Sequence, residues 1–468
     1  MTDIAEFTPI DTGRRVAGHG LDAWLDEARE LLKLAAPLVL TQLSQMAIMT
    51  TDVVMLGRLG KTALASAALG NTIFFFTWLV GAGPTAAVAP TIAHILGARP
   101  GDRAGVRNAV RMGFWAMLII SVPLVSLLLF TRPILLMFGQ SPELAAGAGR
   151  FTAALCWGLP FSLGYQVLRN FSTALSRPRA SLYVMATCIF FNAAGDYGLI
   201  FGHFGLPRLE LVGSGISSAC SYAFAFFAMA VVVSRMRALS KFRVFHRFHR
   251  PHWKLLGELY RLGMPIGLTM MFEAMLFNAA TLIMGTFGTG SVAAHQIALN
   301  ISSLTFMVPL GVGMAATVRV GLAAGAGDGE ALRRAGYTAL LMGAGFMCIA
   351  ALGFWIFPSD IAGLYLVHTA ANADVIALAV VLLRVAGAFE IFDGLQVVGA
   401  LSLRGLKDAQ MPMWIAGLSY WLVGFPCCLW LAFAWHLKGL GIWIGLATGL
   451  FAAAVLMVGR FWCLSRTR

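Results

Sequence analysis

Charged residues are scarce in this chain. Asp, Glu, Lys and Arg together make up 12% of its 468 residues, while hydrophobic residues make up 59%. A soluble globular protein carries roughly a quarter of its residues as charged types, so this composition excludes a soluble fold. Because helices satisfy their own backbone hydrogen bonds within lipid, we expect an all-α polytopic membrane protein.

Several catalytic and metal-binding motifs are also missing. None of the seven Cys residues forms a Cys-x-x-Cys pair, and neither His-Glu-x-x-His nor Gly-x4-Gly-Lys-Ser/Thr occurs. These absences argue against structural zinc, an intramembrane zinc protease and an ATPase. We therefore expect no enzymatic activity and no cofactor. Because the chain has no ATPase motif, any uphill transport by this protein would draw its energy from an ion gradient or from another subunit.

The segment 1–30 holds several charges and no long apolar run, so no cleavable signal peptide is visible there. Residues 22–33 show apolar positions near helical spacing, which indicates a short surface helix that leads into the first span. We take residues 1–30 as a cytoplasmic N-terminal segment.

Apolar runs long enough to cross a bilayer follow one another along the rest of the chain. There are twelve, at 32–57, 64–93, 106–130, 150–174, 180–201, 212–234, 257–285, 292–321, 334–357, 376–402, 412–435 and 440–464. The first six and the last six predict two six-helix lobes, residues 31–234 and 257–464.

An internal repeat supports this division. One constant offset superposes positions of the two halves without a gap, among them Pro37 on Pro265, Thr41 on Thr269, Gly57 on Gly285, Gly83 on Gly311 and Gly97 on Gly325. Two homologous halves of six spans keep the same orientation, so they are parallel repeats about an axis along the membrane normal.

Most of the 34 Lys and Arg residues fall on the side that holds both termini and the loops after even-numbered spans. Short loops rich in Lys and Arg stay in the cytoplasm, so we expect both termini to be cytoplasmic and the protein to lie in the cell inner membrane. The net charge of +13 is thus a topology signal, and a nucleic-acid partner is not expected.

The longest basic stretch, 235–254, lies between the two halves. We take 235–256 as a cytoplasmic linker whose helix lies on anionic lipid head groups, with a regulatory site as the alternative. His246, His249 and His252 recur at every third position, but no Cys or acid is close enough in sequence to favour a metal site.

A few acids stand inside the predicted spans, where a carboxylate costs roughly 2.5 kcal/mol or more on insertion scales. Glu273 has only apolar and small neighbours, and Asp393 lies in the middle of its span with Glu390 one turn before it. Asn192 and Asp196 are four residues apart and share one helix face. Asp52 lies near the end of the first span, and either an interfacial position or ion binding accounts for it.

Other polar residues in the spans complete the candidate set. They are Gln45, Ser218, Asn278, His295, Gln296 and Asn300. For His295, a hydrogen bond to a neighbouring helix and contact with a substrate are equally compatible with the sequence.

Several of these segments resemble the MATE family (multidrug and toxic compound extrusion), and 293–321 is closest to its NorM-type branch. The resemblance rests on twelve spans, two repeats, the Thr51-Asp52 and Asn192/Asp196 positions, Glu273, and the pieces that start at Asp393 and Arg404. It implies two lobes that form a V around a central cavity. It also implies efflux of organic, mostly cationic and aromatic compounds in exchange for H⁺ or Na⁺.

The resemblance also implies roles for single residues. Asp52, Asn192, Asp196 and Ser218 would couple a cation in the first lobe, and Glu273 and Asp393 would couple it or meet substrate in the second. NorM-type proteins often carry Tyr one turn before the second-lobe Asp, where this chain has Phe389. That difference removes one possible oxygen ligand for Na⁺. The remaining candidates, Gln45, Asn278, His295, Gln296, Asn300 and Glu390, would support these sites or contact substrate.

Other readings stay open at this stage. A lipid-linked saccharide flippase of the same superfamily would share the fold, but such proteins often line their cavity with several Arg or Lys, and here only Arg384 clearly lies within a span. An intramembrane enzyme would need a nucleophile with a base, or a metal site, and we find neither pattern in the sequence. A channel or scaffold would not need buried acids in both lobes. We expect a monomer whose partners are drug or metabolite cations and membrane lipids.

Overall fold

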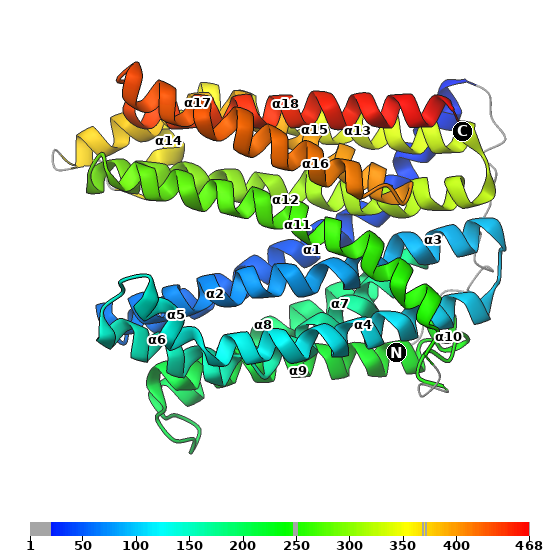
Figure 1. Ribbon diagram of the computed structural model, residues 1–468, viewed down its shortest axis with the longest axis horizontal. Helices are drawn as coiled ribbons and strands as arrows, with labels where there is room; N and C mark the ends of the chain where they lie inside the picture. The colour runs from blue at the N-terminus through cyan, green and yellow to red at the C-terminus, as the bar shows by residue number, and fades with distance from the viewer. Residues whose placement is uncertain (1–19, 247–250, 367–368, 370–371, 468) are drawn as a thin grey trace.

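The computed structural model describes residues 20–246, 251–366, 369 and 372–467, and every regular element within them is helical (Figure 1). The first half contains α1 (Leu21–Gly57), α2 (Lys61–Ala86), α3 (Val88–Ala98), α4 (Arg103–Leu129), α5 (Thr131–Met137), α6 (Pro142–Leu155), α7 (Gly158–Ala174), α8 (Arg179–Phe201) and α9 (Glu210–Arg235).

A short α10 (Arg237–Ser240) precedes the second half. That half contains α11 (Trp253–Gly285), α12 (Thr289–Ala326), α13 (Gly329–Ile356), α14 (Pro358–Gly363), α15 (Ala373–Gly405), α16 (Gln410–Leu418), α17 (Phe425–Leu429) and α18 (Lys438–Arg466). The π-helical stretch Ser419–Gly424 joins α16 to α17, and a second one, Trp430–Ala434, extends α17, so that Gln410–Ala434 forms one span.

The internal repeat is visible in the helix boundaries. α1 ends at Gly57 and α11 ends at Gly285, its repeat equivalent. The same offset maps α12, Thr289–Ala326, onto Lys61–Ala98, the whole of α2 and α3. The glycines that precede these helices, Gly60 and Gly288, both have positive φ, at 119° and 102°, which favours glycine because it has no Cβ. The predicted duplication is therefore confirmed in the fold.

Eleven of the twelve predicted spans correspond to helical stretches of the described chain that are long and apolar enough to cross a membrane, and one of these, Lys61–Ala98, consists of α2 and α3. The predicted fourth span, 150–174, instead comprises the end of α6 and all of α7, with an interruption at Cys156 and Trp157. Residues 22–33 are not a separate surface helix, because α1 runs without a break from Leu21 to Gly57.

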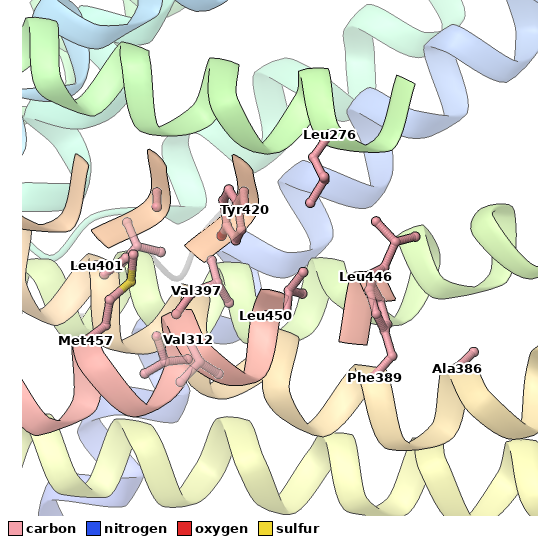
Figure 2. Packing of buried hydrophobic residues seen from close by; sticks show 14 of the residues in the cluster. Leu276, Val312, Ala386, Phe389, Val397, Leu401, Tyr420, Leu446, Leu450 and Met457 are labelled. Carbon is pink, nitrogen blue, oxygen red and sulfur yellow. The ribbon is translucent and has the colours of Figure 1, made fainter. Parts of the chain in front are cut away.

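Two hydrophobic cores correspond to two lobes, which diverge to the left in Figure 1. Figure 2 shows the core of the second lobe, where Leu276 of α11, Phe389 of α15 and Leu446 of α18 are buried. The lobes exchange helix ends, because Leu31–Leu38 of α1 pack in the second-lobe core and Leu256–Ile266 of α11 pack in the first-lobe core.

Small residues let the lobes meet on one side of the molecule. α3 crosses α12 so closely that a Cβ on Gly97 would lie 3.0 Å from the Cα of Gly325. α2 approaches α11 at Gly83, where an added Cβ would lie 2.8 Å from the backbone nitrogen of Gly267. In the same region, His94 Nε2 is 2.7 Å from the carbonyl oxygen of Gly405.

The junction between α2 and α3 follows Pro84, which has no N–H to continue the hydrogen-bond ladder. Side chains of α7 bind carbonyl groups here: Gln166 Nε2 donates to the Ala82 oxygen at 3.4 Å and Asn170 Nδ2 donates to the Thr85 oxygen at 2.8 Å. Backbone groups freed within a membrane need such partners. The polar face of α7 therefore stabilises the bend.

The predicted basic linker is described only in part, because His249 and its neighbours lie outside the described residues. The described part follows α9 with the short α10, and Leu239, Phe242 and Val244 pack in the first-lobe core.

Candidate functional site

The first candidate site lies in the first lobe, where three helices bring polar side chains together. Ser218 Oγ of α9 donates to Asp52 Oδ2 of α1 at 3.2 Å. The Asp52 carboxyl group also faces Asn192 and Asp196 of α8. The helical spacing of four residues places Asn192 and Asp196 on the same face, and α8 packs against both α1 and α9.

These first-lobe groups are short of hydrogen-bond donors. Asn192 and Asp196 are fully buried, and neither the Asn192 amide nor the Asp196 carboxyl oxygens have a hydrogen-bond partner of regular geometry. Asp52 Oδ1 is unsatisfied as well. Two interacting carboxyl groups, of which Asp196 is fully and Asp52 partly buried, disfavour the doubly ionised form, so this arrangement can take up a proton or hold a cation.

The second candidate site joins α11 and α15 in the second lobe. Asp393 and Glu390 are buried, at 4% and 0% exposure, and the charges of Glu273 of α11 and of Glu390 both act on Asp393. Glu390 accepts a hydrogen bond from Thr305 Oγ1 of α12 at 2.7 Å, whereas Asp393 Oδ1 has no partner. Glu273 and Asp393 are thus near enough for their charges to interact, and Glu390 has a separate hydroxyl partner.

Two residues at the second site were missed by the sequence analysis. Arg404, near the end of α15, faces Glu273, and Tyr420 is completely buried with a hydroxyl that has no hydrogen-bond partner. Glu273 and Asp393 are the charged groups that act on Tyr420. Tyr420 reaches this position from the π-helical stretch Ser419–Gly424, which shifts side chains relative to an α-helix.

Phe389 lies in the aromatic core rather than among oxygen atoms. Its ring packs edge-on against Phe277 and Trp443, with centroid distances of 6.0 and 5.4 Å, and only 1% of the residue is exposed. A Tyr hydroxyl is therefore absent from position 389, while Tyr420 supplies one from another helix.

His295 links three helices through both of its ring nitrogens. Trp443 Nε1 of α18 donates to His295 Nδ1 at 3.1 Å, so the ring proton resides on Nε2. Nε2 lies 3.0 Å from Thr281 Oγ1 of α11. With no exposed surface, His295 serves as a helix-to-helix link and is not placed to contact a substrate.

Four of the remaining candidates are exposed or partly exposed. Asn278 is exposed and its Nδ2 donates to the carbonyl of Ala274, one turn earlier, at 2.8 Å. Gln296 and Asn300 are exposed on α12, and Gln45 is partly exposed on α1. None of these four makes a hydrogen bond to Glu273 or Asp393 within the described part of the chain.

The placement of arginine differs from the sequence interpretation. Arg384 is exposed, whereas Arg169 of α7 is 6% exposed and donates from Nη1 to Gln42 Oε1 at 2.8 Å. Arg404 is a second inward-facing arginine. Arg384 is therefore not the arginine that lies inside the protein, and the number of Arg residues alone does not separate an exporter from a flippase.

Among the described residues, no three His, Cys, Asp or Glu side chains cluster as they would around a transition-metal ion. The acid clusters offer carboxylate, amide and hydroxyl oxygens, which are the ligands of hard cations. This donor set suits a hard cation better than a transition-metal ion.

A family model matches two segments of this chain, residues 37–197 and 265–430, and its description is MatE. The two matches begin at Pro37 and Pro265, the positions that the internal repeat superposes. The chain belongs to the MatE family. The predicted family and fold are therefore confirmed.

Relatives matched over nearly their whole length agree with this assignment. The chain is 42% identical over 447 residues to a probable multidrug resistance protein NorM of Rhizobium meliloti, covering 95% of both chains. It is 43% identical to the protein of the same name in Mesorhizobium japonicum, with 97% of both chains covered. The solved eukaryotic MATE transporter AtDTX14 has the same fold, with a TM-score of 0.83, 22% identity, and coverage of 95% of this chain and 98% of that one.

Proposed function

We propose that this MatE protein is a secondary multidrug efflux transporter that exchanges organic, mostly cationic and aromatic compounds for H⁺ or Na⁺. The observation that carries the proposal is that each lobe holds a buried acid on which the charge of a second, partly buried acid acts. Asp52 interacts with Asp196 in one lobe and Glu273 with Asp393 in the other, and Asp196 and Asp393 retain unpaired oxygens. The NorM names of its relatives support multidrug compounds as the substrate class.

Competition for these carboxyl groups would couple the two movements. A buried carboxyl group binds a proton or a cation in preference to remaining a bare anion. The inward-facing and outward-facing states would hold the coupling ion with different affinities. Loading the ion then shifts the population towards the state that holds it more tightly. A drug cation that needs the same acids would leave as the ion enters.

The distribution of Lys and Arg supports an inner-membrane orientation with both termini in the cytoplasm. In that orientation the side on which the lobes meet is cytoplasmic, and the lobes diverge towards the outside. We take the protein as a monomer, since the two lobes of one chain supply both acid clusters.

Transport by purified protein in liposomes tests the proposal. ΔpH and ΔNa⁺ are imposed separately, and uptake of a fluorescent aromatic cation is followed. We expect uphill transport with at least one gradient, and its loss in Glu273→Gln, which keeps the shape of the side chain but fixes it as neutral. Glu143→Gln provides the matched control, because Glu143 is exposed at the start of α6.

Full gradient-driven transport by Glu273→Gln would show that this residue does not couple the ion, and Asp52→Asn would then test the first-lobe site. The flippase remains the second candidate because Arg169 and Arg404 face inward. Lipid translocation without cation transport would favour it.

A further inference from the structure

A pocket of about 390 Å³ lies on the side where the lobes touch, away from both acid clusters. It opens between α11 and the turn that joins α15 to α16. Its charged lining residues are Glu258, Arg261, Lys407 and Asp408, and Thr91, Leu262, Ala409 and Gln410 complete it.

The internal repeat explains why space remains here. Thr91 of α3 is the repeat equivalent of Arg319 in α12. In the second repeat unit, Arg319 fills the corresponding region and donates from Nε to Glu27 Oε1 of α1 at 2.8 Å. The position equivalent to Glu27 is Leu255, so both members of that ion pair are absent on the side of the pocket.

A second pair of equivalent residues differs in the same way. Glu30 and Lys33 of α1 form an exposed ion pair with a distance of 2.6 Å. Their repeat equivalents are Glu258 and Arg261 of α11, and both line the pocket. Among the described residues, neither Glu258 nor Arg261 has an ion-pair partner within 4.0 Å, unlike Lys33.

The charges that remain in the pocket have a net positive sum. Asp408 is neutralised by Arg460 of α18, whose Nε lies 2.6 Å from Asp408 Oδ2. Glu258 opposes one of the two cations, Arg261 and Lys407, and leaves about one positive charge unbalanced. Lys407 has a φ of 60°, in the left-handed region where the Cβ of a residue crowds its own backbone. The turn thus holds Lys407 at the pocket in a conformation that few non-glycine residues adopt.

The pocket also lies near helix ends, which is where lipid head groups would be found in the orientation proposed above. Arg261 is eight residues after the start of α11 at Trp253, and Lys407 follows the end of α15 at Gly405. Basic pockets between helices at this level hold the phosphate of lipid head groups.

We propose that this pocket binds a singly charged phosphate group, which lies between Arg261 and Lys407, as in the phosphodiester of a phospholipid head group. The ligand would contact α11, whose first half packs in the first-lobe core, and the turn after α15 in the second lobe. Its binding therefore stabilises the state in which the lobes meet on this side.

Binding measurements on the purified protein in detergent test the proposal. The probes are dihexanoylphosphatidylglycerol, inorganic phosphate, and dihexanoylglycerol as a phosphate-free match. We expect Arg261→Gln and Lys407→Gln each to weaken dihexanoylphosphatidylglycerol binding about tenfold, the value of one charge-assisted hydrogen bond. Lys33→Gln, the same change at the repeat-equivalent position of Arg261, should leave it unchanged.

Thr91→Arg supplies a variant that acts by a different route. It introduces the residue found at the equivalent position 319, and we expect it to fill the pocket and compete with the phosphate. Arg261 and Lys407 are exposed, so their substitutions leave the buried cores intact.

The probes separate the sources of the phosphate. Loss of both dihexanoylphosphatidylglycerol and inorganic phosphate binding in the same variants supports a site for phosphate from either source, and loss of the lipid probe alone supports a head-group site. Unchanged lipid-probe binding in Arg261→Gln and Lys407→Gln would overturn the proposal, as would equal binding of dihexanoylglycerol.

Discussion

Gly97 of α3 packs against Gly325 of α12, and the internal repeat makes each the equivalent of the other. A contact between equivalent positions lies on the pseudo-two-fold axis that relates the two lobes. This close approach of the lobes is thus made where neither copy has a side chain, and a single substitution acts directly on that contact.

We expect Gly325→Val to separate the lobes on this side, because even a Cβ at Gly325 would meet the Cα of His94 at 2.9 Å. Overpacking of this kind costs about 1–3 kcal/mol. Spin labels on α3 and α12 should report a longer distance than in the unsubstituted protein. Gly345→Val is the control, since nothing lies within 4 Å of its added Cβ.

The ion pair between Glu27 and Arg319 should be stronger than those on the surface. Glu27 is 1% exposed and accepts hydrogen bonds from two nitrogens of Arg319, whose side chain is 26% exposed. We expect Glu27→Gln to destabilise the protein by about 3 kcal/mol, because it leaves a largely buried guanidinium without its partner. Unfolding in mixed detergent micelles measures this change.

The exposed pair Glu30–Lys33 offers the comparison for that measurement. Glu30→Gln should lower the free energy of unfolding by less than about 1 kcal/mol, as is usual for solvent-exposed ion pairs. Equal losses of unfolding free energy in Glu27→Gln and Glu30→Gln would contradict the prediction that the buried ion pair is the stronger one. A double-mutant cycle with Arg319→Gln gives the coupling energy itself.

Tyr420→Phe tests the hydroxyl group that faces the second-lobe acids. Its hydroxyl has no hydrogen-bond partner, so its removal should change the melting temperature little. We expect transport driven by the coupling gradient to fall about tenfold if this hydroxyl helps to hold the ion. Tyr183→Phe, at an exposed position, should have no effect, and normal transport by Tyr420→Phe would remove Tyr420 from the site.

The pH dependence of the charged pocket follows from Lys407. Although Lys407 is exposed as a residue, the protein atoms around its ammonium group lower the pKa below the usual value, against an opposing effect of Glu258. A lysine with a lowered pKa loses its charge earlier as the pH rises, so binding of dihexanoylphosphatidylglycerol should weaken as the pH rises from neutral towards about 10.4, the ordinary lysine value. Lys407→Arg should give a flat profile over that range, and a flat profile with Lys407 present would exclude its role.

Composition and the internal repeat were enough to predict the number of spans and their division into two lobes. The interruption at Cys156 and Trp157 was not predicted, because both residues suit an apolar run. The inner ends of α1 and α11, which pack in the opposite lobe, could not be assigned from a linear division of the chain either.

The acid clusters were accessible to sequence reasoning because a carboxyl group inside an apolar run is conspicuous. The charges of Asp52 and Asp196, and those of Glu273 and Asp393, do act on one another, while their roles remain predictions. Tyr420 gave no such signal, since a Tyr in an apolar span is common and its inward direction depends on a π-helical stretch. His295 was ambiguous until Trp443, far away in the sequence, was placed beside it.

The two copies of the repeat also differ in stiffness. The second copy crosses the protein as one helix, Thr289–Ala326, whereas the first is divided at Ala87, three residues after Pro84. An interrupted helix bends more easily than a continuous one. Two lobes that descend from one ancestral sequence therefore need not share a movement equally, and the flexural strain of each transport cycle would fall on the first.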